Sequence, residues 1–253
     1  MDTQNQDEKK SGFNFKAVTL VVATTVATGM MAFTDVGNIL KTDVLNLPEH
    51  AAFDGTSYPI KKIPDWTHLK AEKRDLAYSQ LEAGDLTDVP YYDASQLAVS
   101  TDTLKWGNPV DDAIRNAKIT YSTPYLGNYL LDGRENGGSH PAVDIKVPEG
   151  TPVYAIANGV VMKESAQSSG FGHHIVIQHN NFPSFENPEQ KVVLYSSYSH
   201  LSENLVKVGD LVLRGQQIAL SGKTGTATTP HVHFQIDNDQ APWHPFWRFT
   251  WQE

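Results

Sequence analysis

Short runs of β-forming residues, separated by turn signals, recur from about Ile119, and this pattern restricts the fold more than any other feature of the sequence. Such runs, bounded by Gly, Pro, Asn or Asp, are typical of strands in an all-β domain. The dipeptide Asn158-Gly159 lies between two of them and predicts a two-residue hairpin. The runs are Val143 to Val147, Pro152 to Ala157, Val160 to Lys163, His174 to His179, Val192 to Tyr198 and Gln217 to Leu220.

The last strand signal, His231-Val232-His233-Phe234, carries two histidines two residues apart. Residues i and i+2 of a strand point to the same face, so His231 and His233 project together while Val232 and Phe234 point the other way. A histidine pair of this kind can also be a solvated strand face. Partners elsewhere in the chain therefore decide whether the pair is functional.

Two further segments offer such partners. Val143, Ile145 and Val147 alternate with polar residues, which puts Asp144 on the polar face of a strand, and His140 in the preceding loop can fold back towards it. An imidazole and a carboxylate are good zinc ligands.

Three protein ligands, His140, Asp144 and His233, would leave the fourth position of a tetrahedral Zn²⁺ open for water. The chain has no H-E-x-x-H helix, so the glutamate base of that metalloprotease design is missing. His231, on the ligand strand, and His200, expected at the end of a strand, are the candidates for proton transfer.

The composition argues against one class of function and excludes one kind of metal ligand. The formal net charge of −9 argues against a nucleic-acid binder, which needs a basic face to neutralise phosphates. The chain has no cysteine, so a metal must be bound by histidines and carboxylates.

An uncharged, largely apolar run extends from Ala17 to Phe33, and Lys9, Lys10 and Lys16 precede it. The lysine bias predicts a cytoplasmic N-terminus with the remainder of the chain outside. The run is at the short end of the roughly 17–25 residues that span a bilayer. Ala27-Thr28-Gly29 would also serve as a signal-peptide cleavage site, and a buried core helix is a third interpretation. We favour an uncleaved single-pass anchor.

The chain from about Ser139 to Ile236 resembles the lysostaphin-type (LytM-like) family of zinc endopeptidases that cleave cell-wall peptides. The family's His-x-x-x-Asp, Tyr-x-His-Leu and His-x-His-Phe motifs stand in the same order here. They are His140 to Asp144, Tyr198-Ser199-His200-Leu201 and His231-Val232-His233-Phe234. Ala142 and Thr229 occupy positions where the family usually has glycine.

The resemblance implies one Zn²⁺ per chain, bound by His140, Asp144 and His233. It implies that His200 and His231 orient the attacking water, accept its proton and stabilise the tetrahedral intermediate. The implied fold is a compact antiparallel β-sandwich with the metal in a groove, and the implied substrate is a peptidoglycan peptide.

We accordingly expect a tail at residues 1–16, a membrane anchor or signal peptide at 17–33, a partly helical extracytoplasmic linker at 34–118 and a zinc endopeptidase domain at 119–253. Within the linker, Asp65 to Glu82 is expected to be helical, with Asp65 as N-cap and Gly84 as the stop. The aromatic residues Trp243, Phe246 and Trp247 are expected to close the domain or, as second choice, to line the substrate side.

The predicted function is cleavage of peptide bonds in peptidoglycan stems or cross-links in the cell envelope. The predicted location is extracytoplasmic, with the membrane as a partner through the N-terminal helix. A rival interpretation is a non-catalytic envelope module that binds or activates another hydrolase. It is weaker because all five polar motif positions are filled. A carbohydrate-binding β-domain would not need three histidine motifs.

Overall fold

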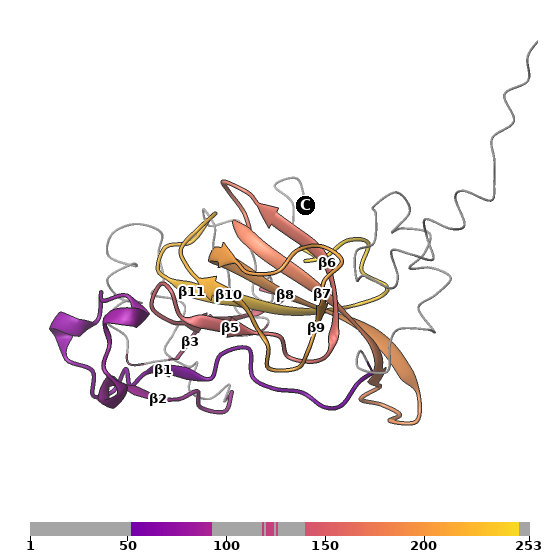
Figure 1. Cartoon of the computed structure of the whole chain (residues 1–253), viewed down its shortest axis with the longest axis horizontal. Helices are drawn as coiled ribbons and strands as arrows, with labels where there is room; N and C mark the ends of the chain where they lie inside the picture. The colour runs from indigo at the N-terminus through magenta and orange to yellow at the C-terminus, as the bar shows by residue number, and fades with distance from the viewer. Residues whose placement is uncertain (1–51, 93–117, 119, 124, 126–139, 248–253) are drawn as a thin grey trace, which may run out of the picture. The chain divides into compact units, whose positions relative to one another are not determined.

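Nine strands joined by antiparallel pairing form the main sheet of the protein (Figure 1). The computed structural model describes residues 52–92, 118, 120–123, 125 and 140–247. Across the sheet the strands follow the order β3-β4-β11-β8-β7-β6-β9, and β10 pairs with both β5 and β8. Their bounds are β3 (Tyr121–Thr123), β4 (Val143–Lys146), β5 (Pro152–Tyr154), β6 (Gly159–Ala166), β7 (His173–Pro183), β8 (Lys191–Asn204), β9 (Leu211–Val212), β10 (Gln217–Ser221) and β11 (His231–Asn238).

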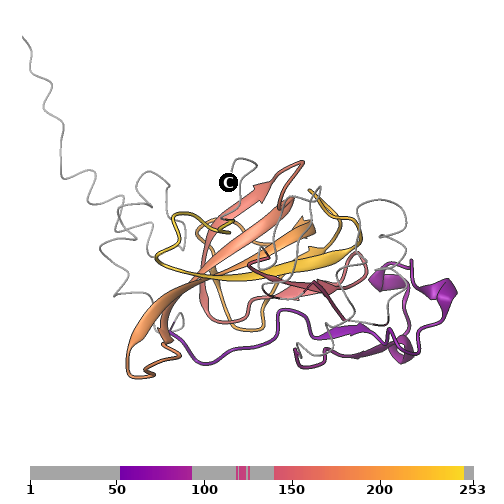
Figure 2. The same ribbon diagram turned by 180° about the vertical axis from the view of Figure 1, so that it is seen from behind.

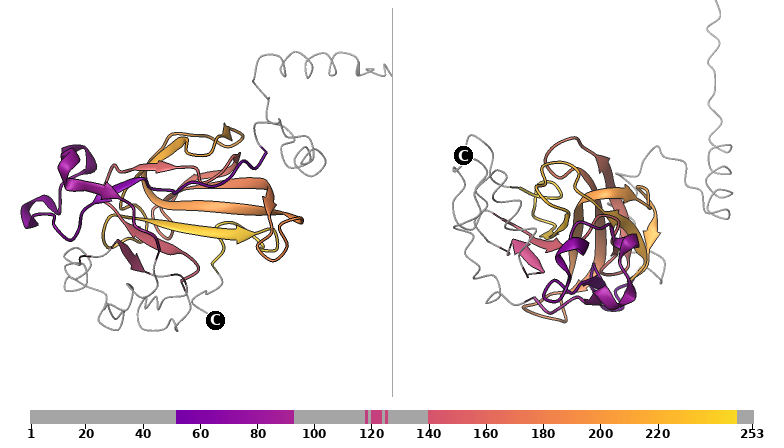
Figure 3. Two further views of the ribbon diagram at one scale, coloured as in Figure 1. Left: turned by 90° about the horizontal axis from the view of Figure 1, so that it is seen from below. Right: turned by 90° about the vertical axis from the view of Figure 1, so that its left-hand side faces the viewer.

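The long strands β7, β8 and β11 lie side by side at the centre of this sheet (Figures 2 and 3). The mainly β, antiparallel fold predicted from the sequence is confirmed. The strands form one connected sheet, rather than two separate sheets of a simple sandwich, because β10 links β5 to the end of β8.

A hydrophobic core lies on the side of the sheet opposite the histidines of β11. Val232 and Tyr198 are fully buried in it, and Phe234 packs against it. Side chains of this size contribute roughly 1.5–3 kcal/mol each when fully buried. Residues before the main sheet join the same core at intervals of three, namely Ile60, Ile63, Trp66 and Leu69.

The α-helix expected over Asp65 to Glu82 is not formed. The segment instead runs between β1 (Lys62–Pro64) and β2 (Leu86–Asp88), which pair with each other, through three short 3₁₀ helices. The Asp65 carboxylate does accept hydrogen bonds from the next backbone N–H groups, but the turn it caps does not continue. The apolar stripe of this segment is too thin to stabilise a long helix by packing. Burying individual apolar side chains in the core is the more favourable arrangement. The 3₁₀ helices are η2 (Ala71–Lys73), η3 (Tyr78–Gln80) and η4 (Ala83–Asp85).

The hairpin predicted at Asn158-Gly159 is wrong, because β5 pairs with β10 while β6 pairs with β7 and β9. The Asn158 amide instead accepts a hydrogen bond from Arg214 N and donates one to Ala52 O. Gly159 is required by close packing, since a Cβ there would lie 2.4 Å from the carbonyl oxygen of Gln178.

The predicted anchor or signal peptide at 17–33 lies outside the described residues, as does the predicted tail at 1–16. In the described part of the chain, no helix is long and apolar enough to cross a membrane. The domain boundaries given above therefore remain predictions.

Candidate metal centre

Strand β11 presents His231 and His233 to one face of the sheet, as the alternation predicted. Its neighbour β4 places Asp144 opposite His233 and Lys146 opposite His231. Directly opposed residues in an antiparallel pair project to the same side. The pairing register therefore brings a carboxylate beside both histidines, while Val232 between them enters the core.

Three potential ligand atoms converge at this point. The Oδ1 atom of Asp144 is 3.2 Å from Nε2 of His140 and 3.2 Å from Nδ1 of His233, and these two nitrogens are 3.2 Å apart. All three side chains are buried, and they form a group that could hold a metal ion. His140 precedes β4 and folds back onto Asp144, as expected from the sequence.

A chain of hydrogen bonds along β11 fixes the tautomer of His233. The Nε2 amide of Gln235 donates to Asp237 Oδ1 and to Phe246 O, each over 2.7 Å, so its Oε1 faces His233. That oxygen is 3.2 Å from His233 Nε2 and can only accept a hydrogen bond. His233 Nε2 therefore carries the proton, and the lone pair of Nδ1 points to the cluster. A metal-binding histidine commonly has such an outer partner.

His231 and His200 lie beside the cluster with their ring centroids 4.6 Å apart. Each donates its Nδ1–H to a backbone carbonyl: His231 to Thr229 over 2.7 Å and His200 to Thr224 over 2.8 Å. Nε2 is therefore the nitrogen with the free lone pair in both rings. The Nε2 atom of His231 is 3.7 Å from Asp144 Oδ1.

His200 has a backbone conformation that a residue with a side chain seldom adopts. It lies within β8 with φ of +61°, and it was expected at the end of a shorter strand. The β7–β8 register shifts beside it, between the pairs His173–Leu201 and Ile175–Tyr198. A bulge of this kind re-aims a side chain without ending the strand, and strained backbone of this type concentrates at functional sites.

Burial and mutual charge lower the pKa values of two imidazoles of the cluster, His200 and His233. Burial, followed by repulsion from His231 and His233, lowers the pKa of His200 to about 3. Burial likewise lowers the pKa of His233. Burial alone would raise the pKa of Asp144, but His140 and His231 outweigh it and hold that pKa well below its usual range. Neutral imidazoles beside an ionised carboxylate are the protonation states in which these groups bind metals.

Aromatic rings border the same cluster. The centroid of the Trp247 ring is 6.3 Å from that of His140 and 6.2 Å from that of His233, and Phe171 lies 5.5 Å from His233. Trp247 is therefore on the side of the candidate site, the position ranked second in the sequence analysis. Trp243 is exposed and packs on Phe246.

Two residues near the cluster were missed by sequence reasoning. Gln235 and Asp237 continue the alternation of His231 and His233 on the same face of β11, and both are buried. Asp237 also accepts hydrogen bonds from Phe246 N and His244 Nδ1. The signal for them was a run of four alternating polar side chains on a strand whose other face is largely apolar.

Residues 138–245 match peptidase family M23. The solved catalytic domain of lysostaphin from Staphylococcus simulans is 35% identical, with a TM-score of 0.37. That match covers 51% of this chain and 86% of the lysostaphin chain. The matched residues form a peptidase M23 domain.

The chain also has similar curated relatives. It is 42% identical over 124 residues to an uncharacterized metalloprotease of Haemophilus influenzae, covering 48% of this chain and 23% of the relative. It is 32% identical over 170 residues to the peptidoglycan DD-endopeptidase ShyB of Vibrio cholerae, covering 67% of this chain and 36% of ShyB. The chain thus spans only about a quarter to a third of the length of these curated relatives.

Proposed function

We propose that the protein is a zinc-dependent endopeptidase that hydrolyses peptide bonds in peptidoglycan stems or cross-links. The observation that carries the proposal is the group His140, Asp144 and His233, whose ligand atoms all lie within 4.8 Å of one another beside two further histidines. The family assignment and relatives named peptidoglycan endopeptidases, such as ShyB, support the substrate class.

The donor set fits zinc. Two imidazole nitrogens and one carboxylate oxygen are the ligands of many catalytic zinc sites, which keep a fourth position for water. The hydrogen bond from His233 Nε2 to Gln235 Oε1 presents the remaining ring nitrogen as a lone pair. The set lacks thiolates, since the chain has no cysteine, and a magnesium or calcium site would be built mainly from oxygen ligands.

When bound, Zn²⁺ supplies a Lewis acid that lowers the pKa of water and polarises a carbonyl. The chain's own residues then handle the protons. His200 and His231 hold their Nδ1–H groups on backbone carbonyls, which leaves Nε2 of each ring as an acceptor. His231 accepts the proton there and returns it to the leaving amine, while His200, whose pKa burial lowers to about 3, orients the attacking water. The buried surroundings strengthen each of these interactions.

We further infer that the enzyme acts in the cell envelope, outside the cytoplasm. Peptidoglycan peptides are found there, and the apolar run at 17–33 behind a lysine-bearing tail is the sequence signal for export or anchoring. The membrane is proposed as a partner through that segment only.

The test combines metal analysis with digestion of purified peptidoglycan by the full chain. We expect about one zinc per chain, and release of soluble fragments that a chelator stops and added zinc restores. His233→Ala should lose the zinc, whereas His231→Ala should keep it and lose turnover. His68→Ala is the matched control, because this exposed histidine pairs only with Asp65 in the described structure.

The non-catalytic alternative predicts a different result. A binding or activating module would not digest peptidoglycan by itself, and His231→Ala would leave its binding to cell walls unchanged. Digestion by His231→Ala at the parent rate would refute the proposed proton-transfer role.

A further inference from the structure

Strand β8 carries two serines beside the candidate metal centre that the chemistry proposed above does not use. In the β8–β11 pairing Ser199 stands opposite His233, and Ser197 stands opposite Gln235. Directly opposed residues of an antiparallel pair project to the same side of a sheet. Both serines therefore lie on the face that bears the metal cluster, next to the strand that supplies one of its ligands.

His174 on β7 extends this set of polar side chains by one more strand. Val176 stands opposite Ser197 in the β7–β8 pairing, and His174, two residues earlier on β7, projects to the same side. Ile175, which alternates with them, enters the hydrophobic core on the opposite face. We call the three side chains the polar row: Ser197, Ser199 and His174.

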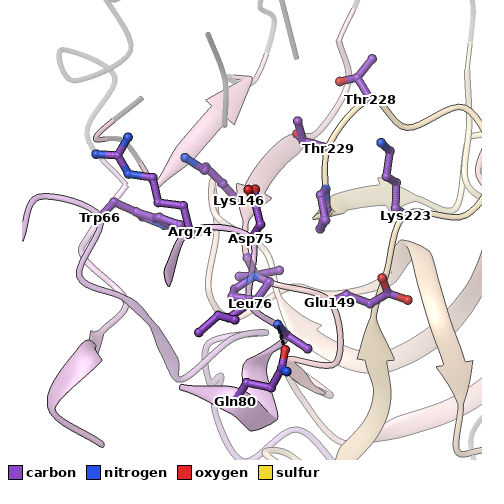
Figure 4. Close-up of a pocket in the computed structure, with 14 residues that line it drawn as sticks. Trp66, Arg74, Asp75, Leu76, Gln80, Lys146, Glu149, Lys223, Thr228 and Thr229 are labelled. Carbon is purple, nitrogen blue, oxygen red and sulfur yellow. Dashed lines mark hydrogen bonds between the residues drawn. The ribbon is translucent and has the colours of Figure 1, made fainter. Parts of the chain in front are cut away.

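The polar row is separate from the cavity of about 640 Å³ that is drawn in Figure 4. That cavity is lined by residues between 66 and 80, by the end of β4 with the residues after it, and by the loop that leads into β11. Its lining includes none of the three residues of the row. Because β11 lies between β4 and β8, the cavity and the row are on opposite sides of β11.

The polar atoms of the row are buried without partners. All three side chains are fully buried. In the described part of the chain, five buried side-chain nitrogen or oxygen atoms lack a hydrogen-bond partner, and three of them are Oγ of Ser197, Oγ of Ser199 and Nε2 of His174. The great majority of buried polar groups are paired, so a concentration of unpaired ones on one face marks a place that a ligand or water occupies.

The row offers both hydrogen-bond donors and an acceptor. His174 donates its Nδ1–H to the Gly172 carbonyl over 3.0 Å, which leaves the lone pair on Nε2. Burial lowers the pKa of His174, so the ring is neutral near pH 7 and Nε2 accepts a hydrogen bond. A serine hydroxyl donates as well as accepts. The main chain of a peptide, which is uncharged and has both C=O acceptors and N–H donors, matches this set.

The ring of Phe171 covers the row. Its centroid lies 5.8 Å from that of His174 on β7 and 5.5 Å from that of His233 on β11. Strand β8 runs between β7 and β11, which are therefore roughly 9.5 Å apart, so the ring lies over β8 and its serines. Phe171 is only partly buried, and a phenyl ring makes no hydrogen bond that would hold it there. Rotation of this side chain would open the row to a substrate bound at the metal centre.

We propose that the polar row is a subsite that binds the main chain of the substrate peptide beside the scissile bond. The hydroxyls of Ser197 and Ser199 donate to peptide carbonyl oxygens, and Nε2 of His174 accepts a peptide N–H. The proposal rests on the proposed function and deepens it, because it names substrate-binding residues outside the metal cluster. Contacts to the main chain select peptides with an unmodified backbone rather than a particular side chain.

The first experiment measures the activity and the stability of two serine variants of the full chain. Ser197→Ala and Ser199→Ala each remove a hydroxyl that no described residue binds. We expect kcat/KM for a purified cross-linked peptidoglycan peptide dimer to fall by roughly 3–10-fold in each variant, the effect of losing one hydrogen bond to the substrate. The melting temperature of the metal-free protein should not fall, because removing an unpaired buried hydroxyl breaks no hydrogen bond.

Ser196→Ala is the matched control on the same strand. Ser196 is also fully buried, but its Oγ faces the core and forms hydrogen bonds with His179 and Tyr198. This variant should lose stability and keep the parent kcat/KM. Parent kcat/KM in Ser197→Ala and Ser199→Ala, or melting temperatures that fall as far as in Ser196→Ala, would overturn the subsite while the proposed peptidase activity stands.

The second experiment tests the acceptor on His174. A series of the same dimer is prepared in which one backbone amide N–H at a time, away from the scissile bond, is replaced by an ester oxygen. For the parent we expect a position at which the ester lowers kcat/KM by roughly 3–10-fold. In His174→Phe, which lacks the acceptor, the ester and the amide at that position should be cleaved alike. A series without such a position, or a difference that persists in His174→Phe, would overturn the role of His174.

If the parent cleaves no form of the dimer, the proposed function fails, and titration calorimetry with the unmodified dimer still tests the row. Binding that is roughly 3–10-fold weaker in Ser197→Ala and Ser199→Ala, but unchanged in Ser196→Ala, would support the subsite. Equal binding by the parent and all three variants would overturn it.

Discussion

The hydrogen bond between Gln235 and His233 predicts that a residue outside the ligand set controls zinc affinity. Gln235→Met keeps a similar volume on β11 but removes the oxygen that lies 3.2 Å from His233 Nε2. The imidazole then loses the acceptor that fixes its tautomer and ring orientation. Loss of such an outer partner typically weakens metal binding by about 10–100-fold, or roughly 1.4–2.7 kcal/mol.

The same substitution also lowers stability, because Gln235 Nε2 donates to Asp237 Oδ1 and Phe246 O. At roughly 0.5–1.5 kcal/mol for each of three hydrogen bonds, we expect a loss of about 1.5–4.5 kcal/mol in the free energy of unfolding of the metal-free protein. The two effects are measured separately, by competition with a zinc-binding dye at 25 °C and by urea unfolding in the presence of chelator.

Gln178→Met separates the effect on the metal from a general effect on folding. Gln178 is also a buried glutamine, and its Nε2 donates to Asn180 Oδ1 on β7, away from the cluster. This control should lose stability but keep the parent zinc affinity. Parent zinc affinity in Gln235→Met would refute the positioning argument, as would an equal loss of affinity in Gln178→Met.

Two further predictions concern stability. Burial, only partly offset by the hydrogen bond to the Asn158 carbonyl, lowers the pKa of His179 to about 4. The unfolded chain therefore binds a proton that the folded chain excludes, and stability falls as the pH drops through the window from about 6.5 to about 4. We expect His179 to account for about 2 kcal/mol of the decrease in the free energy of unfolding between pH 7 and pH 5, measured by urea unfolding. In His179→Gln this decrease should be smaller by about the same amount. An identical pH dependence in the two proteins would contradict the argument. Gly159→Ala should lower the free energy of unfolding by at least about 1–3 kcal/mol, because its Cβ would press against the Gln178 backbone. Both this variant and Gly84→Ala, which has open space around its Cβ, are compared by thermal unfolding, and equal melting temperatures for the two variants would rule out the packing argument.

The parts of the fold that follow from local alternation could be predicted from the sequence. The face shared by His231 and His233 depends only on strand geometry, and the approach of His140 to Asp144 spans only the three residues between them. Both are short-range consequences of residue order.

The parts that depend on distant packing could not be predicted. The residue pair Asn158-Gly159 favours a hairpin when only its neighbours in sequence are considered. In the structure the Asn158 amide instead binds backbone groups 56 and 106 residues away. His200 was expected at a strand end because nothing in its neighbours indicates a bulge. The burial of Ile60 and Ile63 against the main sheet is likewise a tertiary effect that outweighs local composition.

The central claim is that His140, Asp144 and His233 together coordinate one zinc ion. Its most direct test is anomalous scattering at the zinc absorption edge from crystals of the protein grown without added metal. We predict a single strong peak within about 2.0–2.2 Å of His140 Nε2, Asp144 Oδ1 and His233 Nδ1. Absence of a peak there after incubation with zinc, or a zinc ion held by other residues with these three uncoordinated, would contradict the account.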